Sequence, residues 1–108
     1  MSGIVTGDDV ALPVTLKKDN ATFNINPGAT VKASIISLDR ATVLIASVTV
    51  SNVAAGADWP NSLVVVEFSS AETGSITAYD PALLEIQVDD GGKLTWFVNL
   101  DIVKGTIA

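Results

Sequence analysis

Residues 84–100, LEIQVDDGGKLTWFVNL, constrain the fold more than any other part of this 108-residue chain. On each side of an acidic and glycine-rich centre, apolar residues alternate with polar ones, which is the pattern of a half-buried strand. Two such strands joined by a short turn form a β-hairpin. A change of register by one residue would turn every apolar side chain to the wrong face, so the apolar residues themselves fix the pairing.

The length of the turn follows from this pairing. A three-residue loop over residues 90–92 brings apolar side chains together in three cross-strand pairs, namely Val88 with Leu94, Ile86 with Trp96, and Leu84 with Val98. Loops of two or four residues would set the apolar residues of one strand against the opposite face of the other. We therefore expect a type I turn followed by a glycine bulge, with Gly92 at positive φ.

Alternation and turn signals divide the rest of the chain into short strands. Pro13 cannot donate a hydrogen bond to a neighbouring strand, so the first of them lies at an edge or turns its backbone outward there. The nearly continuous apolar run of residues 62–68 favours a central strand. Five strands are expected before the hairpin, over residues 10–16, 22–25, 30–37, 42–51 (one long strand, or two broken near Ala46) and 62–68.

A helical turn and a lead-in complete the chain. Ser69 and Glu72 have the spacing of a capping box, which predicts a short helix over residues 70–77. Residues 1–8 are expected to form a mobile N-terminal arm unless another subunit holds them. The length suits one domain over residues 1–108. We therefore expect an all-β, antiparallel β-sandwich of seven or eight strands with one short helical turn.

Composition excludes several classes of function. The chain has no cysteine and no histidine, so it lacks disulfides, thiolate metal sites and the commonest general base. Its formal charge of −6 disfavours a nucleic acid partner, which requires clustered basic side chains. The sequence shows no basic segment before an apolar run of signal length, and no window approaches 18 uninterrupted apolar residues, so no membrane partner is expected.

The acidic residues do not form a recognisable catalytic or metal site. Asp8-Asp9 and residues 89–92 lack the alternating oxygen ligands of a calcium-binding loop and are interpreted as turns. Glu67, Glu72 and Glu85 would have to supply two paired carboxylates for glycoside hydrolysis, but nothing in the sequence fixes their separation. We expect no enzyme activity, no metal and no cofactor.

Several apolar residues are candidates for a protein interface. Trp59 lies in the irregular residues 52–61 and is either a core plug, which is favoured, or an exposed contact. Phe97, Ile36 and Leu38 fall on outward faces, where either a second sheet covers them or they form a patch for another subunit. The first strand can add to a neighbour's sheet through its edge. The candidate interface residues are Val10, Leu12, Pro13, Ile36, Leu38, Trp59 and Phe97.

Three segments, residues 11–35, 62–77 and 83–98, together resemble the immunoglobulin-like domain of tailed-phage virion proteins. The layout is similar to the N-terminal domain of phage baseplate upper proteins. The shared features are a Lys-Asp-Asn type turn at residues 18–20, a strand with Phe23, a Gly-Ala-Thr-Val segment at residues 28–31, and a late hairpin with the Trp96-Phe97 pair. The resemblance covers nearly the whole chain and implies an immunoglobulin-like sandwich.

The resemblance also implies a non-enzymatic structural protein of a tailed-phage virion, located in the virion and assembled in the host bacterial cytoplasm. Such an accessory subunit would pack by edge strands and apolar patches onto baseplate, tail-fibre or head-tail proteins and onto copies of itself. Two alternatives remain open. One is a capsid decoration protein. The other is a small carbohydrate-binding module in which Trp59 and Tyr79 are exposed, and a structure with both residues buried would exclude this second alternative.

Overall fold

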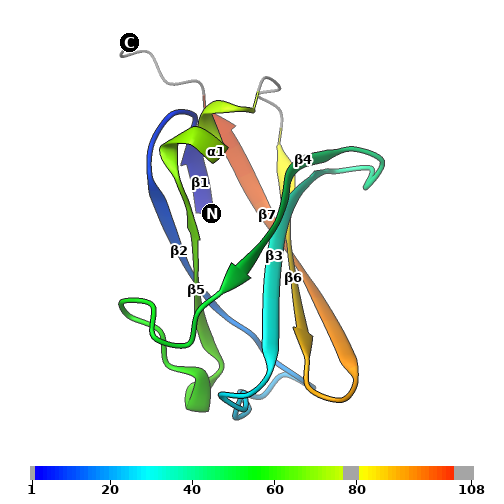
Figure 1. Ribbon diagram of the computed structural model, residues 1–108. Helices are drawn as coiled ribbons and strands as arrows, with labels where there is room; N and C mark the ends of the chain where they lie inside the picture. The colour runs from blue at the N-terminus through cyan, green and yellow to red at the C-terminus, as the bar shows by residue number, and fades with distance from the viewer. Residues whose placement is uncertain (1, 77–80, 104–108) are drawn as a thin grey trace.

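The computed structural model describes residues 2–76 and 81–103, and these residues form an all-β fold, as predicted. Figure 1 shows two sheets packed against each other, with the short α-helix at one end of the molecule. The elements described are β1 (Ser2–Val5), β2 (Val10–Thr15), β3 (Thr30–Ser37), β4 (Val43–Val50), the 3-10 helix η1 (Trp59–Asn61), β5 (Leu63–Phe68), α1 (Ser70–Gly74), β6 (Ala82–Asp89) and β7 (Lys93–Val103).

The larger sheet has five strands in the order β1-β7-β6-β3-β4, and the smaller sheet pairs β2 with β5. The prediction of a purely antiparallel arrangement is wrong, because β1 runs parallel to β7 from the pair Ser2–Leu100 to the pair Val5–Val103. The other strand pairs are antiparallel. The larger sheet is therefore mixed.

Residues 2–9 are part of the fold, which corrects the prediction of a mobile arm over residues 1–8. Ile4 is almost completely buried in the core. The buried Thr73 holds the following turn, since its Oγ1 donates to the Asp8 carbonyl at 2.7 Å and accepts from the Gly7 N–H at 3.0 Å. Asp9 accepts from the Ser70 N–H at the start of α1, so the two aspartates act as turn and cap residues.

Side chains from the facing sides of both sheets form one core. Burial of a valine, leucine or isoleucine side chain contributes about 1.5–3 kcal/mol, so this shared core is what holds the two sheets together. The smaller sheet supplies Leu12, Val64, Val66 and Phe68, and the larger sheet supplies Ile4, Val31, Ala33, Ile35, Leu84, Ile86, Leu100 and Ile102.

The hairpin of β6 and β7 has the predicted register. Val88 pairs with Leu94, and the other two apolar pairs also form, on either side of a loop over residues 90–92. The glycine assignment is wrong, however, because Gly91 has φ +80° and Gly92 is not at positive φ. A hydrogen bond from the Asp90 N–H to the Gly92 carbonyl spans the loop and leaves its middle residue, Gly91, in the left-handed region.

This difference gives a test with a built-in control. A Cβ atom at either glycine would meet nothing within 4 Å, so only backbone conformation distinguishes them. Gly91→Ala is expected to lower the free energy of unfolding by about 1–2 kcal/mol, the cost of an L-residue in the left-handed region. Gly92→Ala is expected to change it much less. Urea denaturation of both variants measures this, and equal losses would contradict it.

Two of the predicted strands differ from the structure. Residues 22–25 form no strand. Residues 62–68 contain β5, which among the described strands pairs only with β2 and is therefore not central. Val65 points to the outer side of β5 but is buried, because the loop around Gly56 lies against it. A loop rather than a neighbouring sheet thus explains the continuous apolar run.

The remaining predictions for β2, β4 and α1 are largely correct. β2 belongs to a two-stranded sheet, so Pro13 lies at an edge, and β4 is one strand with two register shifts opposite β3. The capping box forms, with the Ser69 N–H donating to Glu72 Oε1 at 2.8 Å and the Glu72 N–H donating to Ser69 Oγ at 3.2 Å. The helix ends at Gly74, and the predicted extension to residue 77 lies partly outside the described residues.

Candidate functional site

The outer side of the five-stranded sheet carries an apolar surface. Ile36 on β3 pairs with Val43 on β4 and with Leu83 on β6, which forms an apolar row across three strands. Val43 is 63% exposed, Phe97 on β7 is 38% exposed, and Leu38 in the turn after β3 is 53% exposed. We call these five residues the outer patch.

Arg40 lies over part of the outer patch. Its guanidinium carbon is 4.0 Å from the centre of the Phe97 ring, a cation–π contact. Because β6 separates β3 from β7, the Arg40 side chain must cross the sheet from the β3–β4 turn to reach Phe97. Ile36 and Leu83 also face outward, yet they are only 7% and 8% exposed.

Hydrogen bonds within the β3–β4 turn fix the position of Arg40. The Arg40 N–H donates to the Ser37 carbonyl at 2.9 Å, and Arg40 itself has a positive φ of 63°. Asp39 accepts from the Ser37 hydroxyl and from the Ala41 N–H. The bond from the Ser37 hydroxyl, followed by the bond from the Ala41 N–H, lowers the pKa of the Asp39 carboxyl below its ordinary value because both favour the charged form.

The seven predicted interface residues differ in their exposure to solvent. Leu38, Pro13 and Phe97 are exposed, and Val10 is half-buried. Ile36 faces outward as the alternation predicts, and the two-stranded sheet lies on the opposite side, so it does not cover the outer patch. Leu12 is a core residue, as is Trp59, which is only 4% exposed and thus confirms the favoured interpretation as a core plug.

The three glutamates do not form one site. Glu67 lies between inward-facing residues of β5 and Glu85 between inward-facing residues of β6, so the two side chains are on outer sides of different sheets. Glu72 belongs to the capping box, and Glu85 accepts from the Ser34 hydroxyl at 3.3 Å. Residues 2–76 and 81–103 contain no group of three or more acidic side chains that could hold a metal ion.

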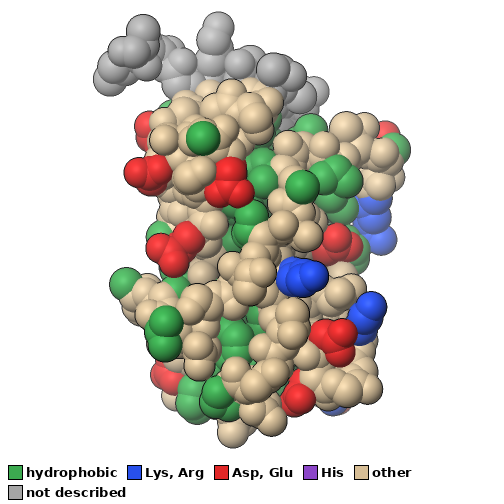
Figure 2. Space-filling model, in the orientation of Figure 1, with side chains coloured by type: hydrophobic (Ala, Val, Ile, Leu, Met, Phe, Trp, Pro, Cys, Tyr) green, Lys and Arg blue, Asp and Glu red, His purple; other side chains and the backbone are tan. Residues whose placement is uncertain are grey.

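Acidic side chains are prominent on the side of the molecule formed by β2, β5 and α1, as Figure 2 shows. These elements and the turn before β2 carry Asp8, Asp9, Glu67 and Glu72. Such a surface repels a phosphate backbone. In the described part of the chain, no helix has the length and apolar character needed to span a membrane.

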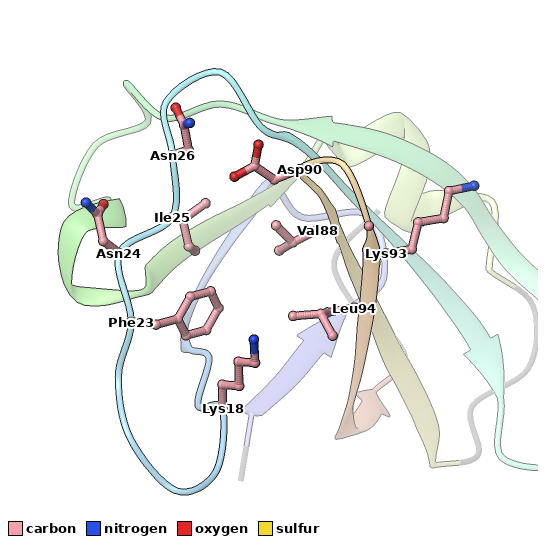
Figure 3. Close-up of a pocket in the computed structure, with 10 residues that line it drawn as sticks. Lys18, Phe23, Asn24, Ile25, Asn26, Val88, Asp90, Lys93 and Leu94 are labelled. Atoms are coloured by element: carbon pink, nitrogen blue, oxygen red, sulfur yellow. The ribbon is translucent and has the colours of Figure 1, made fainter.

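A pocket of about 360 Å³ opens at the end of the molecule, between residues 18–26 and the β6–β7 hairpin. Figure 3 shows its lining. Phe23, Ile25, Val88 and Leu94 form an apolar floor and wall, while Lys18 and Asp90 lie at opposite sides of the opening. Sequence reasoning missed this pocket, since Phe23 was assigned to a strand and Leu94 only to the core face of the hairpin.

The segment that forms one wall of the pocket is irregular but firmly attached. Asp19 and Asn20 both have positive φ in the tight turn predicted for residues 18–20, as in a type I′ turn. The Phe23 N–H then donates to Ser62 Oγ, and the Ile25 N–H donates to the Trp59 carbonyl, each at 2.9 Å. These bonds hold residues 22–25 against η1 and the residue before β5 without adding them to a sheet.

Comparisons with known proteins give no further assignment. No protein-family model, no curated protein and no solved structure matches this chain. Tyr79, the second aromatic residue considered for carbohydrate binding, lies outside the described residues.

Proposed function

We propose that this chain is a non-enzymatic structural protein of a tailed-phage virion, an accessory subunit that docks through the outer patch. The observation that carries the proposal is the exposure of Val43, Phe97 and the adjoining Leu38 on the side of the larger sheet that no other described strand covers. Contiguous exposed apolar residues mark interaction surfaces in soluble proteins. Aromatic and arginine side chains are enriched in such interfaces, and Phe97 and Arg40 supply both.

The strand pairing supports an immunoglobulin-like interpretation of the fold. In such domains the second strand pairs with the fifth, and the third, sixth and seventh strands form the facing sheet, to which variable-type domains add a further strand. Here β2 pairs with β5, β3 pairs with β6, β6 pairs with β7, and β4 extends the larger sheet beside β3. The parallel β1 occupies the other edge of that sheet.

The virion part of the proposal rests on the sequence resemblance. Several of the residues that carry the resemblance have structural roles that stabilise the domain. Asp19 forms the tight turn, while Phe23 stacks on Trp96 with ring centres 5.7 Å apart. The proposed partners are other virion proteins and copies of this chain, held by burial of the outer patch at about 25 cal/mol per Å².

Incorporation into particles tests this function. Virions assembled with the wild-type protein are expected to retain it at a constant copy number through purification, as measured by quantitative mass spectrometry. Val43→Asp places a charge in the outer patch and is expected to reduce incorporation about tenfold or more, because burying a charge without a partner costs several kcal/mol. Immunogold labelling distinguishes a tail position from capsid decoration.

Val53→Asp is the matched control. Val53 is 84% exposed in the loop between β4 and η1, so the same change of charge there leaves the outer patch intact. We expect wild-type incorporation of this variant. Absence of the wild-type protein from purified particles would contradict the proposal. Equal incorporation of both variants would show that the outer patch is not the docking surface.

A further inference from the structure

The pocket between residues 18–26 and the β6–β7 hairpin has the size of a small-molecule site, since such sites begin at about 300 Å³. It exists because the two-stranded sheet does not extend over the beginning of β7. Leu94 is on the inner face of β7 and pairs with the buried Val88, yet Leu94 is 40% exposed. The apolar core is therefore open to solvent at this end.

The pocket is preformed. Phe23 stacks on Trp96 at an interplanar angle of 13°, and the Trp96 Nε1–H donates to the Lys17 carbonyl at 2.9 Å. With the bonds to Ser62 and Trp59, these contacts attach the irregular wall to both sheets. The ordering of this wall takes place on folding rather than on binding, which favours affinity for a small ligand.

Polar groups face each other across the apolar floor. In Figure 3 the Lys18 ammonium points into the pocket from one side and the Asp90 carboxylate lies at the other, whereas Lys93 points away. Within residues 2–76 and 81–103, neither the Lys18 nor the Asp90 side chain makes a hydrogen bond or an ion pair. The pocket thus offers hydrogen-bond donors and acceptors beside apolar surface.

We infer that this pocket binds a neutral saccharide ring. A sugar hydroxyl both donates and accepts, so adjacent hydroxyls satisfy Asp90 and Lys18, while the C–H face of the ring packs on Phe23 and Leu94. The site differs from the alternative considered in the sequence analysis, because Trp59 is buried and does not line the pocket.

The lining disfavours other classes of ligand. A phosphate group would meet the Asp90 carboxylate in a chain of net charge −6. A metal ion would have only the Asp90 carboxylate as a charged ligand in the pocket lining, which is too few to hold it. A wholly apolar molecule would remove water from Lys18 and Asp90 without replacing their hydrogen bonds.

Nuclear magnetic resonance of the two tryptophan indoles tests the inference. Trp96 adjoins the pocket through Phe23, whereas the Trp59 indole lies in the core and serves as a reference. We expect glucose, galactose, mannose or N-acetylglucosamine to shift the Trp96 indole N–H signal in a saturable manner, with little change at Trp59. Absence of a saturable shift with all four sugars would overturn the inference, as would a shift with free leucine but with no sugar.

Substitutions locate the binding site. Lys18→Ala and Asp90→Ala change exposed side chains that make no hydrogen bond or ion pair within the described part of the chain. Both variants are therefore expected to fold and to bind the sugar about tenfold more weakly or worse. Lys32→Ala and Asp101→Ala, on the outer side of the five-stranded sheet, are the charge-matched controls. Equal affinities in all four variants would contradict the assignment. The proposed virion function is tested separately by incorporation into particles, so failure of one proposal is distinguishable from failure of the other.

Discussion

Replacement of Trp59 with alanine is expected to lower the free energy of unfolding by about 3–5 kcal/mol, the usual cost of a large cavity in a core. Trp59 is buried, and its backbone carbonyl accepts from the N–H groups of Ile25 and Ser62. The backbone of Trp59 thus joins the pocket wall to the residue before β5, and its buried side chain fixes that backbone in the core. Urea denaturation followed by circular dichroism measures the loss.

Trp59→Phe separates the packing of the ring from its polar atom. The Trp59 Nε1–H is buried and has no hydrogen-bond partner among the described residues, a state that costs about 1–3 kcal/mol. Phenylalanine removes this donor while filling much of the volume, so we expect a loss less than half that of the alanine variant. A loss as large as that of Trp59→Ala would show that the indole N–H is bonded in solution.

Ile4→Ala is expected to lower the free energy of unfolding by about 2–5 kcal/mol, although residue 4 is close to the start of the chain. Its side chain is almost completely buried and pairs with Ile102 on the inner side of the larger sheet. Val5 is the control, because it belongs to the same strand but is exposed, so Val5→Ala is expected to cost well under 1 kcal/mol. Equal and small effects in urea denaturation would mean that β1 is not bound in solution.

The hairpin could be predicted from sequence because its information is local. Apolar residues with a period of two fix which faces meet, and the loop length then follows from the pairing of Val88 with Leu94. The choice of glycine at positive φ could not be predicted in the same way. It depends on a hydrogen bond between Asp90 and Gly92 that no periodicity encodes.

The features that could not be predicted depend on distant contacts. Residues 2–5 are too few to show a period, and their partners on β7 are nearly the whole chain away. The pocket depends on the difference in width between the two sheets, which leaves Leu94 uncovered. The outward direction of Phe97 was predictable by alternation, but its contact with Arg40 depends on the conformation of a turn.

The parallel pairing of the first and last strands determines how this domain carries load. A force applied between Ser2 and Val103 pulls β1 and β7 along their length in opposite directions. The hydrogen bonds of this pair, together with the bond from the Thr6 N–H to the Val103 carbonyl, are then strained simultaneously rather than one after another. An antiparallel pair pulled from its open end would separate bond by bond. The domain is thus built to resist tension between its two ends through shear.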